Sequence, residues 1–159
     1  MTVQEMLQEV TNAKVQKRAI TNHSVLNEAF DYGSAFSRGM RIDLNDLSIL
    51  LISGTASIDD EGLTVHVGDL PRQTRRTFDN ITGLLASEGA TWKDVVRTTC
   101  YLRDIERDYT AFNEERTAFY KEQGLNPLPA STGIQAVLCR PDLLVEIEAI
   151  AMFRRTASE

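Results

Sequence analysis

The sequence predicts an α+β domain with a mixed β-sheet and two main helices on one face of that sheet. Two amphipathic stretches with a 3.6-residue period, residues 69–88 and 107–123, predict the helices. Apolar and β-branched runs predict strands around them, in the order β-β-α-β-α-β-β. Two helices cover only one face of such a sheet, so we expect a symmetric oligomer to cover the other face.

Length and composition fit one domain with a single core. The chain has 159 residues, of which 42% are hydrophobic, and its net charge of −6 disfavours nucleic-acid binding. No apolar run approaches the roughly 20 residues that span a bilayer. Cys100 and Cys139 form no disulfide framework, and no signal peptide is visible, so we expect a cytoplasmic protein. His23 and His66 stand apart, which argues against a metal site.

The N-terminal region is predicted to precede the main domain. We assign residues 1–30 to an extension and residues 31–159 to a single domain. Within the extension, weak periodicity predicts a short helix over residues 2–12, and residues 15–20 suggest a first strand.

Two strands then follow. Residues 34–44 alternate as a strand would, and residues 47–52 (LSILLI) form a continuous apolar run, which predicts a central strand covered on both faces. Gly54 directly after this run indicates either a β-bulge or a place where a ligand approaches the backbone closely. The side chains expected on one face of the first strand are those of Phe36, Arg38, Met40 and Ile42.

The two helices have clear start and stop signals. Asp69 is a good N-cap for the first, and Pro71 is tolerated in its first turn. Gly89 ends the first helix and Gly124 ends the second. Between them, residues 95–102 (VVRTTCYL) are β-branched and predict a strand.

Residues 143–152 (LLVEIEAIAM) form the most strand-like run of the chain. Side chains two apart share a face of a strand, so this run has one apolar face and one face that mixes acids with apolar groups. The mixed face suits a partner subunit or a small pocket, although a solvent-exposed antiparallel face also fits. Residues 129–137 (PASTGIQAV) are expected to be its hairpin or sheet neighbour. The mixed face holds Glu146, Glu148, Ile150 and Met152, and the apolar face holds Val145, Ile147, Ala149 and Ala151.

At these spacings the chain resembles the reactive intermediate deaminase (Rid) family, also called YjgF or endoribonuclease L-PSP. The resemblance covers residues 34–154 and is carried by ISGTASID, the helix after it, VVRTTCYLRD and LLVEIEAIAM. It implies a chorismate-mutase-like fold assembled as a homotrimer, with ligand sites in clefts between subunits. Well-known members hydrolyse enamines and imines such as 2-aminoacrylate without metal or cofactor. FSRG and SGTASI also resemble the Rid-like half of chorismatases, which are much longer enzymes that hydrolyse an enol ether.

The resemblance also implies which residues form the site. Glu146 matches the family's glutamate that holds or activates the attacking water. Phe36 falls where deaminating members often have a tyrosine, and Asn113 matches an asparagine near the cleft. The remaining matched positions are Ser53 and Gly54, whose backbone lines the cleft, and Ser131, Thr132 and Gly133, which bind substrate.

Ser131 departs from the family pattern. Deaminating members read PAR where this chain reads PAS, and their arginine grips the substrate carboxylate; Gly133 stands where they often have cysteine. Such a charge-assisted bond contributes about 1.5–3 kcal/mol, so its loss weakens binding by roughly a hundredfold. Ser131 and Thr132 carry no charge, so we expect poor 2-aminoacrylate deamination unless Arg38 or Arg140 supplies the cation.

Three functions remain open. The first is a cofactor-free hydrolase of a small enamine, imine or enol-ether metabolite, in which burial and the neighbouring Glu148 raise the pKa of Glu146 for acid–base work. Its ligand is expected to carry a carboxylate. The second is a non-catalytic trimer that binds a small metabolite or a partner protein, which the serine at 131 favours. The third, a ribonuclease, is disfavoured by the acidic balance and the missing basic patch.

Overall fold

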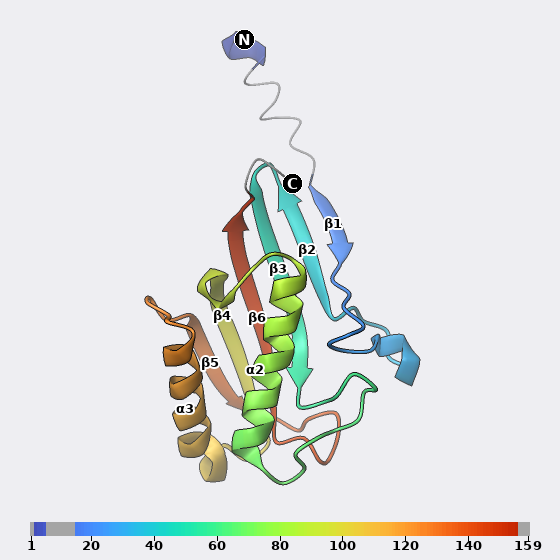
Figure 1. Ribbon diagram of the computed structural model, residues 1–159, viewed down its shortest axis with the longest axis vertical. Helices are drawn as coiled ribbons and strands as arrows, with labels where there is room; N and C mark the ends of the chain where they lie inside the picture. The colour runs from blue at the N-terminus through green and yellow to red at the C-terminus, as the bar shows by residue number, and fades with distance from the viewer. Residues whose placement is uncertain (1, 6–14, 156–159) are drawn as a thin grey trace.

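The protein is built on one mixed β-sheet. The computed structural model describes residues 2–5 and 15–155, and in this part of the chain six strands lie in the order β1-β2-β3-β6-β4-β5 (Figure 1). All neighbouring strands are antiparallel except β4 and β5, which are parallel, so the predicted mixed sheet is confirmed. The strands are β1 (Gln16–Ala19), β2 (Gly39–Leu44), β3 (Leu47–Ala56), β4 (Val95–Leu102), β5 (Ala130–Gln135) and β6 (Val145–Arg154).

Both long helices lie on the same face of the sheet, as predicted (Figure 1). They are α2 (Leu70–Ser87) and α3 (Ile105–Glu122), and the short 3-10 helices are η1 (Ala29–Tyr32) and η2 (Trp92–Asp94). Within residues 2–5 and 15–155, none of the helices combines the length and the hydropathy needed to cross a bilayer.

The predicted helix boundaries have a local cause. The Asp69 side chain accepts a hydrogen bond from the Arg72 backbone N–H at 3.1 Å and so caps α2, with Pro71 in its first turn. Gly89 follows α2 with φ of 74° and Gly124 follows α3 with φ of 64°. This left-handed conformation ends both helices where glycine permits it.

The hydrophobic core lies between the sheet and the two helices. The apolar face of β6, which its alternation predicts, faces this core, where Val145, Ile147 and Ala151 are fully buried. Opposite them, an aromatic cluster joins α2, η2 and α3 through edge and stacked contacts with ring centroids 4.6–5.8 Å apart. The members of this cluster are Phe78, Trp92, Phe119 and Tyr120.

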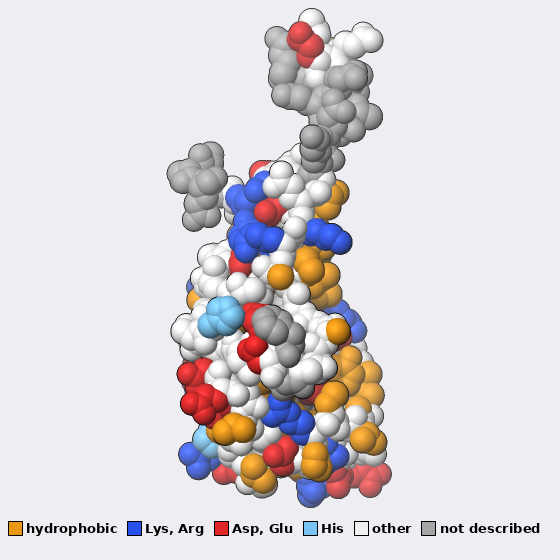
Figure 2. Space-filling view, turned by 90° about the vertical axis from the view of Figure 1, so that its right-hand side faces the viewer, with side chains coloured by type: hydrophobic (Ala, Val, Ile, Leu, Met, Phe, Trp, Pro, Cys, Tyr) orange, Lys and Arg blue, Asp and Glu red, His pale blue; other side chains and the backbone are white. Residues whose placement is uncertain are grey.

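The other face of the sheet carries exposed apolar side chains. Leu51 is 40% exposed, Met152 42% and Ile134 43%. Figure 2 shows hydrophobic side chains along the right-hand edge of the view, on the side of the sheet away from the helices. The expectation that residues 47–52 are covered on both faces is therefore wrong for a single chain, because no second layer of the described chain packs against Leu51.

Two strand predictions need correction. Residues 129–137 were expected beside the last strand, but β5 pairs with β4 and lies at the edge of the sheet. A strand that returns through a helical crossover such as α3 forms a parallel pair with the strand before it, which explains this position. The strand expected over residues 34–44 begins only at Gly39, so Phe36 and Arg38 lie in the preceding loop.

The N-terminal segment contributes to the sheet. β1 pairs with β2 along its whole length, from Gln16 opposite Asp43 to Ala19 opposite Met40. Ile20, directly after β1, is fully buried in the core. Of the helix expected over residues 2–12, residues 3–5 are helical and residues 6–12 lie outside the described chain.

Candidate functional site

Glu146 and Gly54 lie against each other on the face of the sheet away from the two helices, which we call the open face. The register of β3 and β6 shifts between Ile52 and Thr55, which is a β-bulge. This bulge brings Gly54 so close to the glutamate that a Cβ at position 54 would lie 2.1 Å from Glu146 Oε1. Gly54 therefore forms a bulge, and the group that approaches its backbone is the Glu146 carboxylate.

The carboxyl group of Glu146 is half-buried, and its surroundings disfavour the ionised form. Burial raises its pKa, and the negative charge of nearby Glu148 raises it further. Glu148 differs, because its Oε1 accepts a hydrogen bond from the Tyr101 hydroxyl at 3.2 Å. Among the described residues, no hydrogen bond or ion pair to the carboxyl group of Glu146 is found. Of the two acids, Glu146 is thus the one suited to exchanging a proton with a ligand.

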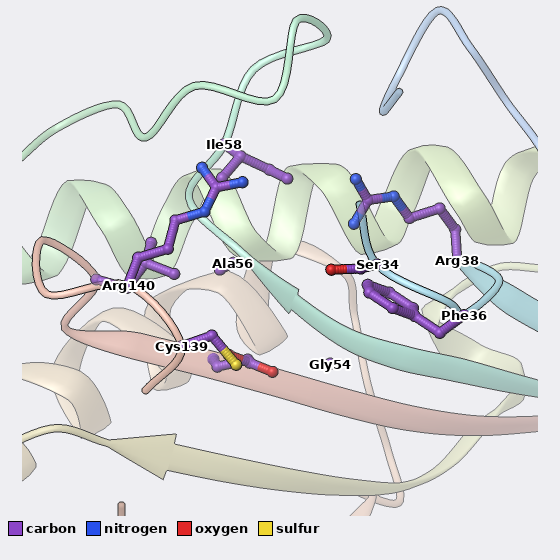
Figure 3. A pocket seen from close by; sticks show the side chains of 10 residues that line it. Ser34, Phe36, Arg38, Gly54, Ala56, Ile58, Cys139 and Arg140 are labelled. Carbon is purple, nitrogen blue, oxygen red and sulfur yellow. The ribbon is translucent and has the colours of Figure 1, made fainter. Parts of the chain in front are cut away.

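A small pocket opens beside Glu146. Its volume is about 110 Å³, and Figure 3 shows Phe36 and Arg38 on one side of it and Cys139 and Arg140 on the other. The backbone carbonyl of Asn27 accepts a hydrogen bond from Arg38 Nε at 2.7 Å, and that of Gly62 accepts one from Arg140 at 2.6 Å. Loop oxygens thus hold both guanidinium groups near the pocket that contains the acid.

The two cysteines differ in their surroundings. Cys100 is fully buried in β4, and burial raises the pKa of its thiol. This fits a structural role as a small apolar side chain. Cys139 is exposed and lines the Glu146 pocket, which sequence reasoning did not foresee because Cys139 lies in a loop without a periodic pattern.

A second group of predicted site residues surrounds Ser131 at the edge between β5 and α3. Ser131 Oγ accepts hydrogen bonds from Arg116 at 3.1 Å and from the Thr98 hydroxyl at 3.1 Å. The same guanidinium group also donates to Asn113 Oδ1 and lies over the Phe112 ring, with Cζ 5.1 Å from the ring centroid. Ser131 and Asn113 are thus joined through Arg116.

The strand alternation separates Thr132 from its neighbours. Gly133 faces α3, where a Cβ would lie 3.7 Å from the Tyr109 ring. Thr132 instead accepts a hydrogen bond from Arg97 at 2.8 Å, and both residues are on the open side of the sheet. Ser131 and Gly133 therefore share one surface, and Thr132 does not.

Within one chain, the predicted site residues form two groups on opposite faces of the sheet. Phe36, Gly54 and Glu146 line the pocket on the open face, while Ser131 and Asn113 are both bound by Arg116 on the helix face. Ser53 lies beside Gly54, but its hydroxyl donates to the Ser37 carbonyl at 2.7 Å and so stabilises the loop before β2.

Arg116 is the main residue that sequence reasoning missed. It connects Asn113 and Ser131 through hydrogen bonds to both side chains. Its position three residues after Asn113 places both on one face of α3, and this was the available signal. Among the described residues, no three His, Cys, Asp or Glu side chains are arranged to hold a metal ion.

The mixed sheet, the two helices on one face and the bulge against a half-buried glutamate define a chorismate-mutase-like α+β protein. Residues 27–153 match the family model described as Endoribonuclease L-PSP. The chain belongs to this family, which also carries the names YjgF and Rid, so the resemblance seen in the sequence is confirmed.

Curated relatives and solved structures agree with this assignment. The 3-aminoacrylate deaminase RutC of Acinetobacter baylyi is 35% identical over 104 residues, which are 65% of this chain and 79% of the relative. A RutC family protein of Pyrococcus abyssi is 33% identical over 65% of this chain and 78% of its own length. The YjgF gene product of E. coli superposes with a TM-score of 0.71 and 25% identity over 86% of this chain and 99% of that one. E. coli TdcF with bound serine has the same fold, with a TM-score of 0.69 and 22% identity over 87% of this chain and 99% of that one.

Proposed function

We propose that this protein is a cofactor-free hydrolase of small, reactive enamine or imine metabolites, with Glu146 as the acid–base group. The observation that carries the proposal is the Glu146 carboxyl group, half-buried against Gly54 with a raised pKa, at a pocket with arginine side chains in its wall. The similarity to a relative named as a 3-aminoacrylate deaminase supports the substrate class.

The reaction needs only proton transfers and one water molecule. Protonated Glu146 gives its proton to the electron-rich carbon of the enamine, which leaves an iminium ion. The resulting carboxylate takes a proton from water as the water oxygen bonds to the iminium carbon. The carbinolamine then collapses to a carbonyl compound and ammonia. A carboxyl group with a raised pKa suits both steps near neutral pH.

We further propose that the complete site forms between subunits of a homotrimer. The Glu146 pocket and the Ser131 group lie on opposite faces of one sheet, so a single chain does not bring them together. Packing the exposed Leu51, Ile134 and Met152 against neighbouring copies would bury them and could bring one group against the other. The free thiols Cys100 and Cys139 agree with a cytoplasmic setting for this assembly.

The direct test is a hydrolysis assay with the purified protein. Freshly generated 2-iminopropionate, 3-aminoacrylate and chorismate are each mixed with wild-type protein and with Glu146→Gln, and carbonyl product or ammonia is followed. We expect acceleration of at least one imine or enamine substrate, lost in Glu146→Gln. If none of the three is consumed faster than in buffer, the hydrolase proposal fails for its best substrates.

The second candidate is a non-catalytic trimer that binds a small metabolite or a partner protein. The serine at position 131 favours it, because the charge that deaminating members carry there is absent from β5. Ligand binding without turnover in the same assay would select this alternative.

A further inference from the structure

Arg116 differs in its partners from the arginines that form ion pairs. Arg18, Arg41, Arg75, Arg107, Arg154 and Arg155 each lie within 4.0 Å of a carboxylate oxygen. Arg116 instead donates to the hydroxyl of Ser131 and the side-chain carbonyl of Asn113, and within the described chain no ion pair of Arg116 with an acid is found. Its positive charge is therefore not neutralised by a neighbouring acid.

The guanidinium group is nevertheless held in one place. Two hydrogen bonds fix its edge, and the Phe112 ring lies beneath it. A cation that is positioned by neutral groups keeps its ability to attract an anion, whereas a cation in an ion pair does not. This arrangement is that of a preformed anion site rather than of a structural salt bridge.

A hollow of suitable size lies beside Arg116. Its volume is about 370 Å³, within the range of small-molecule sites. Polar groups come from Arg116 and Ser131, and also from Thr117 and Lys121 further along α3. The remaining wall is formed by Tyr120, Leu125, Leu128 and Pro129. A small ligand with a charged end and an apolar body matches this lining.

The position of the guanidinium group also fits the missing charge on β5. Ser131 points toward α3, and its Oγ lies 3.1 Å from the Arg116 nitrogen. A longer cationic side chain at position 131 would extend into the space that the Arg116 guanidinium group occupies. The positive charge that β5 lacks at Ser131 is thus supplied at nearly the same place by Arg116 of α3.

We propose that Arg116 is the substrate-binding cation of this protein and recognises the carboxylate of its enamine or imine substrate at the edge between β5 and α3. The proposal deepens the hydrolase function and rests on it for the identity of the ligand. It assigns the specificity for a charged substrate to α3, and Arg38 and Arg140 then belong to the separate pocket around Glu146.

Binding of a non-reactive anion tests the proposal without any turnover. Pyruvate is titrated into the full-length protein by calorimetry, and methyl pyruvate serves as its uncharged counterpart. We expect the wild type to prefer pyruvate, and Arg116→Gln to bind pyruvate about 10- to 100-fold more weakly with little change for the ester. Arg116→Lys keeps the charge without the planar fork and should lie between the two.

The matched control is Arg97→Gln. Like Arg116, Arg97 donates a hydrogen bond to a hydroxyl on β5, that of Thr132, but it is exposed and lies on the opposite face of the sheet. We expect Arg97→Gln to bind pyruvate like the wild type. In the Arg116→Gln background, Ser131→Arg should restore the preference for pyruvate, because it returns a cation to the adjacent position.

Three results would overturn the inference: no preference of the wild type for pyruvate over its ester, an unchanged preference in Arg116→Gln, or an equal loss in Arg97→Gln. Failure of the double variant to regain the preference would also count against it. A failure of the hydrolase proposal would be distinguishable from a failure of the anion site. Glu146→Gln should still bind pyruvate through Arg116, so Arg116-dependent binding without any turnover would reject the hydrolase and keep the anion site.

Discussion

Gly54 and Glu146 lie so close together that any side chain at position 54 would displace the Glu146 carboxyl group. A Cβ there would lie 2.1 Å from Glu146 Oε1 and 3.1 Å from its carboxyl carbon. The bulge in β3 therefore serves to seat the carboxylate on the open face of the sheet. The SGT sequence at the end of the apolar run therefore limits where the Glu146 carboxyl group can lie.

Gly54→Ala is expected to impair hydrolysis by displacing the Glu146 carboxyl group. A displacement of about 1 Å in a catalytic group can reduce the rate by roughly a hundredfold, so we expect a loss of that order in kcat. Glu146→Asp provides the control, because its shorter side chain has room beside a new methyl group. Gly54→Ala should therefore cost much less in the Glu146→Asp background, and equal losses in both backgrounds would contradict the steric explanation.

Glu146→Gln is expected to stabilise the protein at neutral pH. Burial and Glu148 raise the folded-state pKa of Glu146 above its ordinary value of 4.5, so the folded state holds this proton more tightly than the unfolded state. The free energy of unfolding then falls as pH rises from about 4.5 through the folded-state pKa, and above that pKa the ionised carboxylate destabilises the folded state. A neutral glutamine removes this destabilisation.

Melting curves of both proteins between pH 4 and pH 8 check this sign. The melting temperature of Glu146→Gln should exceed that of the wild type at pH 7 to 8, and the two should converge near pH 4, where the wild-type carboxyl group is protonated in both states. A difference that stays constant across this range would show that the titration of Glu146 is not its cause.

Leu51→Asp is expected to dissociate the proposed trimer. Leu51 is 40% exposed in one chain and lies opposite Ile150 in the neighbouring strand, in the middle of the open face. A charge there would have to be buried on assembly, which is unfavourable by several kcal/mol. Light scattering at micromolar concentration should report a monomer, and the hydrolase activity should fall with it.

Leu63→Asp is the matched control for that experiment. Leu63 is 60% exposed and lies in the loop after β3 rather than on the sheet. The Leu63→Asp variant should leave the mass of the assembly measured by light scattering unchanged. A wild type that is already monomeric at micromolar concentration would reject the trimer itself.

An ionic cluster around the buried Glu88 joins strands β1 and β2 to the C-terminal end of α2. Glu88 is 6% exposed and accepts hydrogen bonds from Arg18 at 2.6 Å and from Arg41 at 3.1 Å. Arg41, which is 8% exposed, also pairs with Asp43 at 3.0 Å. This cluster ties β1 and β2 to the helix layer.

Glu88→Ala is expected to lower the free energy of unfolding by about 3 kcal/mol, because it leaves the buried Arg41 charge only partly compensated. For a chain of this size, such a loss lowers the melting temperature by roughly 6–12 °C. Asp46→Asn breaks the exposed pair with Arg154, which should cost less than about 1 kcal/mol. Urea unfolding of the two variants separates these values, and similar losses would show that the cluster is no more important than a surface pair.

The sequence determined every feature that depends on neighbouring residues along the chain. The alternation of β6 predicted its buried and mixed faces, the periodic stripes predicted α2 and α3, and Asp69 and Gly89 marked where α2 begins and ends. These features follow from the periods of strands and helices and from local hydrogen bonds, so a short window of sequence is sufficient. The same local run offered Glu146 and Glu148, and the resemblance to the family pointed to Glu146.

Only the tertiary structure decided which distant residues meet. It placed β5 beside β4, set Gly54 against Glu146 and brought Arg116 to Ser131, each across a wide separation in the chain or between different elements. Such contacts depend on how helices and strands pack around a shared core, and no local pattern encodes their partners. The sequence thus singled out Glu146 and the serine at position 131 as candidates, while the fold placed the guanidinium group of Arg116 beside that serine.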